Sequence, residues 1–479
     1  MENNIKNKTV RGVFWSSIER FSVQGVQFVL GIIIARLLEP SDYGIIGMLA
    51  IFLAVSQTVI DSGFSSALIR KQDRTEIDFS TVFYFNIFIG IVFYLILFFV
   101  SPVIALFFKT PILEDLVKVV ALNLLFNSLA IVQRTKLTIQ VDFKTQTKVS
   151  LIAVLLSGIV GLIMAYVGLG IWALAFQSVL NAGLNVVFLC FFSRWKPLWV
   201  FSIRSFKELF SYGSKLLLSA LIDTLYNNIY TIIIGKLFRA SDLGNYTRAN
   251  QFAQFPSSNL TEVFHRVAFP MLSDIQHNDE KLKMIYRQYL RMAAFIIFPL
   301  MCGFAAVASP FIMFILTEKW IGIVPLLQLL CFSYMLYPVH AINLNLLQVK
   351  GRSDLFLKLE VMKKCIGTAI LCVTIPFGIS GMCIGGIFTS IIGLVINTHY
   401  TGKIISIGFF RQMIDLLPIL FSSLSMFFIV YFITSLIQDC FIGLLVGFLS
   451  GVVYYALLNI IIKSKEMKLI IGLINFRGK

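Results

Sequence analysis

A thirteen-residue stretch, IIIARLLEPSDYG at residues 32–44, returns 200 positions later as IIIGKLFRASDLG at residues 232–244. Seven of the thirteen positions are identical, and the arginine of the first copy becomes a lysine in the second. Each copy has the pattern of an apolar helix end, a short polar turn and a new helix, for which the Ser-Asp pair (41 and 42, or 241 and 242) would supply N-cap oxygens. Because the polar turn is repeated together with the apolar run, the sequence predicts a duplicated architecture.

The segments on both sides of these turns are long and apolar. Hydrophobic residues make up 58% of the chain and charged residues 13%, about half the charged fraction of a soluble domain. The apolar runs are continuous over about twenty residues or more, as a membrane-crossing helix requires, and lack the alternation of barrel strands. We expect an all-α integral membrane protein with fourteen transmembrane helices, at about 13–35, 44–68, 80–107, 113–133, 149–167, 170–193, 208–235, 243–265, 290–316, 321–347, 358–377, 379–401, 413–435 and 439–462.

The eighth span, residues 243–265, is too polar to be identified by hydropathy. It follows the repeated turn just as the second span does, and it decides on which side every later loop lies. With fourteen spans and a cytoplasmic N-terminus, 31 of the 40 basic residues fall in inside segments and 5 in outside turns. Omitting the span would move outside, among others, the twelve basic residues of 350–364, 402–412 and the C-terminal end, against the positive-inside rule. We therefore expect the span to cross the membrane and both termini to be cytoplasmic.

The repeat relates the first span to the seventh, and an offset of six spans keeps the orientation in the membrane. The two halves are therefore expected to be a parallel repeat about an axis along the membrane normal. This predicts two six-helix lobes followed by two further helices. The expected divisions are an N-lobe at 1–193, a cytoplasmic linker at 194–207, a C-lobe at 208–401, and the last two helices with a cytoplasmic tail at 402–479.

Charge and cysteine usage exclude several functions. The net charge of +16 is spread over many short loops, which argues against a nucleic-acid partner. The seven cysteines form no CxxC pair and nearly all lie in apolar spans, and the four histidines have no metal-ligand spacing. Such cysteines are typical of apolar packing. We therefore expect no metal and no cofactor.

Polar residues recur every three or four positions in four of the spans, so that they share a helix face. Ionisable groups inside a membrane are costly and usually face a cavity, although hydrogen bonding between helices is the alternative explanation. The candidate binding residues are Arg20, Gln24 and Gln27 in the first span, Gln57 and Asp61 in the second, Lys215, Asp223 and Asn227 in the seventh, and Arg248, Gln251, Asn259 and Glu262 in the eighth.

Four motifs follow one another along the chain: ARLLEPSDYGIIGM at 35–48, DSGFSSALI at 61–69, GLGIWALAFQ at 168–177 and FPMLSDIQHND at 269–279. Their residues and their order resemble the polysaccharide transporter family. That family comprises the O-antigen and exopolysaccharide flippases of the MOP (multidrug/oligosaccharidyl-lipid/polysaccharide) superfamily. The resemblance implies a MOP flippase-like fold, with a cavity lined by spans 1, 2, 7 and 8 that opens alternately to each side. The four polar spans, found from spacing alone, are the same ones.

The resemblance also implies a substrate. It is an undecaprenyl-diphosphate-linked oligosaccharide, moved from the inner to the outer leaflet of a bacterial plasma membrane for O-antigen, capsule or exopolysaccharide synthesis. Arginine suits phosphate oxygens, so we expect Arg20 and Arg248 to contact the diphosphate early and late in transit. Asp223, halfway along the seventh span, could carry a coupling H⁺ or Na⁺. Membrane lipids, glycosyltransferases and a polysaccharide polymerase are the expected partners.

Two other functions are alternatives to this one. A multidrug or cation antiporter of the same superfamily would favour an acidic, aromatic cavity, and the mixture of acids and bases here leaves that alternative open. A membrane enzyme such as a polysaccharide polymerase would need a long external loop for its catalytic groups, and the sequence predicts none. We therefore expect a transporter and no enzymatic activity.

Overall fold

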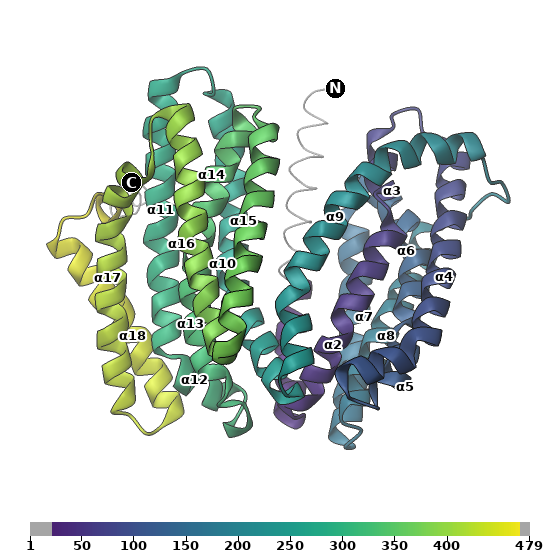
Figure 1. Cartoon of the computed structure of the whole chain (residues 1–479), viewed down its shortest axis with the longest axis horizontal. Coiled ribbons are helices and arrows are strands. Elements are labelled where there is room, and N and C mark those ends of the chain that lie inside the picture. Colours follow the sequence, from purple (N-terminus) through teal and green to yellow (C-terminus); the bar gives the residue numbers. More distant parts are fainter. Residues whose placement is uncertain (1–21, 470–479) are drawn as a thin grey trace. The chain divides into compact units, whose positions relative to one another are not determined.

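The computed structural model describes residues 22–469, except for the side chains at positions 215, 267 and 353. This part of the chain contains helices and connecting turns, and no strand. Its elements, of which α2 to α18 are labelled in Figure 1, extend over the following ranges. They are a first helix Ser22–Leu37, α2 Pro40–Asp61, α3 Phe64–Arg70, α4 Glu76–Phe108, α5 Leu113–Val120, α6 Leu122–Ile139, α7 Phe143–Tyr166, α8 Ile171–Ser193, α9 Ile203–Leu237, α10 Ala240–Asp274, α11 Asp279–Ala306, α12 Ala308–Ile315, η1 Glu318–Trp320, α13 Ile323–Met335, α14 Tyr337–Val349, α15 Ser353–Thr374, η2 Ile375–Phe377, α16 Gly378–Ile405, α17 Phe409–Ser435 and α18 Cys440–Ile461.

Every predicted span from the second to the fourteenth coincides with one helix or with two consecutive helices. Within residues 22–469, eleven helical segments are long and apolar enough to cross a membrane, and one of them, Asp354–Ile405, contains both α15 and α16. The all-α membrane fold is therefore confirmed. The polar α10 is not among the eleven, but its 35 residues rise about 50 Å, more than the roughly 30 Å of hydrocarbon. That α10 crosses the membrane stays a prediction.

The two copies of the repeat adopt the same helix–turn–helix. The preceding helices end at Leu37 and Leu237, and the following ones begin at positions 40 and 240. The expected N-caps were wrong by two or three positions. In the first copy the N-cap is Glu39, because Pro40, which needs no hydrogen bond for its nitrogen, starts the helix. The aspartates act from inside the first turn, where Asp42 and Asp242 accept the backbone N–H three residues earlier, at 3.1 and 3.3 Å.

The repeated glycines pack the two turns against each other. A Cβ atom on Gly44 would lie 1.7 Å from the carbonyl oxygen of Ala240, and one on Gly244 would lie 1.8 Å from that of Pro40. Each copy therefore places its glycine against the first helical turn of the other copy. This reciprocal contact explains why both copies have glycine at this position.

The chain divides into two compact units, unit 1 at residues 1–244 and unit 2 at residues 245–479. In unit 1, α9 packs against α2, α3 and α4, and in unit 2, α11 packs against α13 and α17. The division falls within the first turns of α10. The divisions expected from the sequence, with an N-lobe ending at residue 193, concern the transport lobes and stay predictions.

Helices α2 and α9 run antiparallel in close contact. Near the C-terminal end of α2, Thr58 Oγ1 lies 3.1 Å from Thr224 Oγ1 on α9. At the far end, a Cβ on Gly63 would lie 2.6 Å from the Gly213 carbonyl oxygen, and one on Gly213 would lie 2.6 Å from that of Ser62. The contact includes the junction between α2 and α3, where Gly63 has a positive φ of 70° that glycine adopts readily.

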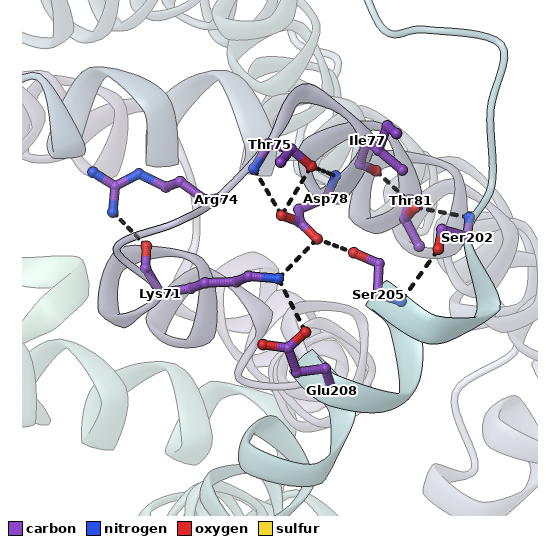
Figure 2. Close-up of polar contacts among 9 residues, drawn as sticks. All are labelled: Lys71, Arg74, Thr75, Ile77, Asp78, Thr81, Ser202, Ser205 and Glu208. Atoms are coloured by element: carbon purple, nitrogen blue, oxygen red, sulfur yellow. Dashed lines mark hydrogen bonds and ion pairs between the residues drawn. The ribbon is translucent and has the colours of Figure 1, made fainter.

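A buried carboxylate ties the start of α9 to the loop before α4 (Figure 2). Asp78, with 3% of its side chain exposed, lies 3.3 Å from Lys71 Nζ and accepts hydrogen bonds from Thr75 N at 2.7 Å and from Ser205 Oγ. Lys71 Nζ also lies 3.0 Å from Glu208 on α9. Burial works to lower the pKa of Lys71, but hydrogen bonds to Glu208 and Asp78 outweigh it and hold that pKa above its ordinary value.

Candidate functional site

Unit 1 contains two cavities that share part of their lining. One, which we call the carboxylate cavity, has about 620 Å³ and lies among α2, α3, α6 and α9. The other, the amide cavity, has about 460 Å³ and lies among the helix Ser22–Leu37, α2, α6, α7 and α8. Gln57, Asn127 and Arg134 line both. Both volumes fall in the range of about 300–1,000 Å³ that is typical of small-molecule sites.

The carboxylate cavity contains an acid and a base. Asp61 is the last residue of α2, and the break at Ser62 and Gly63, both with positive φ, lets α3 begin beside it. Asp61 Oδ1 accepts a hydrogen bond from Ser65 Oγ at 2.6 Å. This bond offsets the unfavourable position of a carboxylate at a helix C-terminus. Arg134 reaches the same cavity from α6, so the cavity can bind groups of either charge.

The amide cavity is lined mainly by neutral polar side chains. Helix α6 contributes Asn123, Asn127 and Arg134, whose spacing of four and seven residues places them on one helix face, and α8 contributes Asn181 and Asn185. The other polar lining residues are Gln27, Gln57, Ser150 and Ser178. Among the described residues that line this cavity, none is a carboxylate.

Three amide oxygens around this cavity have no hydrogen-bond partner. Asn123 donates its Nδ2 to Ser178 Oγ at 2.8 Å, and Asn185 donates its Nδ2 to the Asn181 carbonyl at 2.9 Å. The oxygens of these two amides, and Oε1 of Gln57, are buried and unpaired. Asn123 and Asn185 are each only 8% exposed. Leaving a buried acceptor unpaired costs about 1–3 kcal/mol. A ligand that donates hydrogen bonds to these three oxygens would remove that cost.

The structure brings together part of the candidate set from the first two spans. Gln27 and Gln57 line the amide cavity, and Gln57 and Asp61 line the carboxylate cavity. Gln24 is half-buried with an unpaired Oε1. Arg20 lies outside the described residues.

The described side chains among the candidates of α9 and α10 do not line these two cavities. Asp223 and Asn227 are exposed on α9, and the side chain of Lys215 lies outside the described part. On α10, Arg248 Nη1 donates to Gln251 Oε1 at 2.6 Å. The remaining two form bonds along the helix, Asn259 with the Phe255 carbonyl at 2.8 Å and Glu262 with Arg266 at 3.3 Å. Roles for all of these in substrate binding stay predictions.

The sequence interpretation missed most of the amide cavity. Asn123 and Asn127 are four residues apart, as are Asn181 and Asn185. The same spacing identified the candidate residues of spans 1, 2, 7 and 8, but these two pairs lie on spans four and six. The predicted fourth span, 113–133, ends one residue before Arg134. Helix α6 in fact continues to Ile139 and carries Arg134 into the cavity wall.

Unit 2 has a cavity of about 610 Å³ beside a cluster of ion pairs. Asp415 on α17 accepts two hydrogen bonds from Arg287 on α11, both at 2.7 Å. Arg291 lies 2.5 Å from Glu466, and the side chains of Asp415 and Glu466 are 4% and 5% exposed. Removing the basic partner of such a buried acid would leave an uncompensated charge in the interior of unit 2. Within residues 22–469, no cluster of His, Cys, Asp and Glu could hold a metal ion.

Comparison with known proteins identifies the family. The model of the family described as "Polysaccharide biosynthesis protein" matches residues 33–325, more than half of the chain. The chain belongs to this family. Among curated relatives, TuaB of Bacillus subtilis (strain 168), a teichuronic acid biosynthesis protein, is 29% identical over 354 residues, which cover 74% of this chain and 73% of TuaB. WzxC of Escherichia coli (strain K12), a lipopolysaccharide biosynthesis protein, is 26% identical and covers 86% of this chain and 84% of its own.

Solved structures show the fold of this polysaccharide biosynthesis protein. The lipid II flippase MurJ in an inward closed conformation aligns with a TM-score of 0.74 at 13% identity, covering 94% of this chain and 100% of MurJ. An inward-facing MATE family multidrug resistance transporter of the MOP superfamily aligns with a TM-score of 0.61 at 15% identity, covering 82% of this chain and 98% of that one. The chain therefore shares the fold of MurJ and of this transporter of the MOP superfamily, as the sequence motifs predicted.

Proposed function

We propose that this protein is a flippase for undecaprenyl-diphosphate-linked oligosaccharides. It moves them by alternating access from the inner to the outer leaflet of a bacterial plasma membrane, for the synthesis of O-antigen, capsule or exopolysaccharide. The observation that carries the proposal is the family match, which joins a chain with the MOP fold to proteins of polysaccharide biosynthesis.

The cavities of unit 1 support this function. A diphosphate needs cationic partners and sugar hydroxyls need amides and hydroxyls, and the lining offers Arg134 together with asparagine, glutamine and serine side chains. The lipid tail needs no pocket because it can stay in the bilayer.

The multidrug or cation antiporter is the weaker candidate. The support for this candidate is the similarity to the MATE transporter, and that similarity concerns only the fold. The amide cavity offers a cation no carboxylate among its described lining residues and places an arginine beside it. The curated relatives are named for teichuronic acid and lipopolysaccharide biosynthesis, which favours the glycolipid substrate.

This function also suggests where the protein lies, which proteins it works with and which ion drives it. The protein is a multi-pass membrane protein, and we place it in the plasma membrane with both termini in the cytoplasm. Glycosyltransferases that build the lipid-linked unit and a polymerase that consumes it on the outer side are its proposed partners. Coupling to H⁺ or Na⁺ is proposed for the acidic residues, with Asp223 as the first candidate.

Deleting the gene and extracting lipids tests the function. We expect an undecaprenyl-linked oligosaccharide to accumulate on the inner leaflet, and re-expression of the wild-type chain to clear it. Susceptibility to cationic drugs, measured in the same strains, should not change. Drug sensitivity without lipid accumulation would replace the flippase with the antiporter.

A further inference from the structure

The amide cavity of unit 1 has unpaired hydrogen-bond acceptors but no buried unpaired donor among its described amides. Its unpaired groups, Asn123 Oδ1, Asn185 Oδ1 and Gln57 Oε1, are all acceptors. The matching donors of Asn123 and Asn185 are already used by Ser178 and Asn181. A ligand that completes this cavity must therefore donate several hydrogen bonds from closely spaced groups, as the hydroxyls of a sugar ring do.

A metal cation would also satisfy amide oxygens, but the cavity opposes it. Its described lining residues include no carboxylate, and Arg134 adds a positive charge. Hard cations in proteins bind through oxygen ligands that usually include carboxylates. A neutral, hydroxyl-rich ligand meets neither obstacle.

Helix α6 places the arginine that suits a diphosphate and the amides that suit a sugar at different depths in the membrane. Asn123, Asn127 and Arg134 share one face, and the eleven residues from Asn123 to Arg134 rise about 16 Å. The basic residues Lys136, Lys144 and Lys148 follow Arg134, so the positive-inside rule assigns the Arg134 end to the inner side. A diphosphate near the inner interface would meet Arg134, and the sugar attached to it would extend towards the amides.

The geometry points to the amide cavity as the glycan subsite of the flippase. It holds the first neutral sugars of the lipid-linked unit by accepting their hydroxyl hydrogen bonds, while Arg134, at the junction with the carboxylate cavity, binds the diphosphate. The inference rests on the proposed function and adds to it which residues distinguish a sugar-bearing lipid from the bare carrier.

Binding to the wild-type full-length chain in lipid nanodiscs tests the subsite. The probes are radiolabelled undecaprenyl diphosphate and undecaprenyl diphosphate carrying one hexose. The variants are Asn123→Leu and Asn185→Leu, which keep the volume and remove the acceptor. Losing a neutral hydrogen bond should weaken binding of the hexose-bearing lipid about two- to tenfold and leave binding of the bare diphosphate unchanged. Arg134→Gln should weaken binding of both lipids.

Asn86→Leu is the matched control. Asn86 lies on α4, is fully buried, and has both amide atoms unpaired, but it does not line either cavity. Its replacement should leave both affinities unchanged. If an asparagine variant fails to fold, as judged by its thermal midpoint, Gln57→Leu replaces it, because Gln57 carries the third unpaired oxygen.

The outcomes separate the two proposals. If the wild-type chain binds neither probe and moves no lipid-linked oligosaccharide, the flippase function fails and the subsite with it. If it transports the oligosaccharide but the asparagine variants affect both probes equally or not at all, the subsite alone is refuted. Loss of sodium binding in these variants, with glycolipid affinity intact, would also overturn the subsite and assign a cation to the cavity.

Discussion

The reciprocal packing of Gly44 and Gly244 allows a quantitative prediction. A methyl group on Gly44 would lie 1.7 Å from the Ala240 carbonyl oxygen, while Cβ contacts under 3.0 Å essentially never occur, so at least 1.3 Å of movement is required. The obstructing atom belongs to the backbone and cannot rotate aside as a flexible side chain can. Overpacking of this kind costs about 1–3 kcal/mol or more, and alanine in a helix regains about 1 kcal/mol.

We therefore expect Gly44→Ala and Gly244→Ala each to destabilise the protein by about 2 kcal/mol. The thermal midpoint of the detergent-solubilised chain, followed by size-exclusion chromatography after heating, measures this. Gly25→Ala is the control, because a Cβ there meets nothing within 4 Å, and it should leave the midpoint unchanged or raise it.

The double variant tests whether the two glycines serve one contact. Once the first methyl group has separated the turns, the second should cost less. The double variant should therefore be destabilised by less than the sum of the two single variants, with a coupling energy of about 0.5–3 kcal/mol. If Gly44→Ala behaved like Gly25→Ala, the packing argument would be refuted. Fully additive effects would show that the two contacts are independent.

Three further predictions concern charged residues. Asp78→Ala should destabilise unit 1 by about 3 kcal/mol, because the buried carboxylate joins several donors. Glu208→Ala, at a side chain that is 57% exposed, should cost less than about 1 kcal/mol. Equal shifts in the thermal midpoint of the two variants would contradict this. Cysteines introduced at Arg239 and Glu280 should be labelled from opposite sides of the membrane, and labelling from the same side would show that α10 does not cross. Asp223→Asn should insert normally and lose any pH- or sodium-dependent transport, and transport that is unchanged across pH and sodium concentration would exclude a coupling role.

Much of the fold could be predicted from the sequence because the bilayer imposes a simple rule on length and hydropathy. The eighth span shows how far other signals extend that rule. Hydropathy alone rejects α10, but the repeated turn and the charge balance predicted a helix where the structure has one. The breaks within spans could not be predicted as easily, since the junction at Ser62 and Gly63 depends on the contact with Gly213, 150 residues away.

The site was predictable only where polarity was dense within one span. Asp61 and Gln57 were found because two polar groups on one apolar helix are conspicuous. The asparagines of α6 and α8 are polar but uncharged, and each pair alone is equally compatible with helix packing. Only the structure shows that both pairs line one cavity and that some of their oxygens have no partner.

The close packing of α2 with α9 affects how the protein is made. The face of α2 that carries Thr58, and the junction at Gly63 that follows it, are covered by a helix that begins at Ile203. At about 5–20 residues per second, the ribosome needs roughly 9–35 s to go from the end of α2 to the end of α9. During that interval this face lacks its contact with α9. A fragment ending at residue 193 should therefore be retained by membrane chaperones or degraded, whereas one ending at residue 244 should accumulate as a folded half.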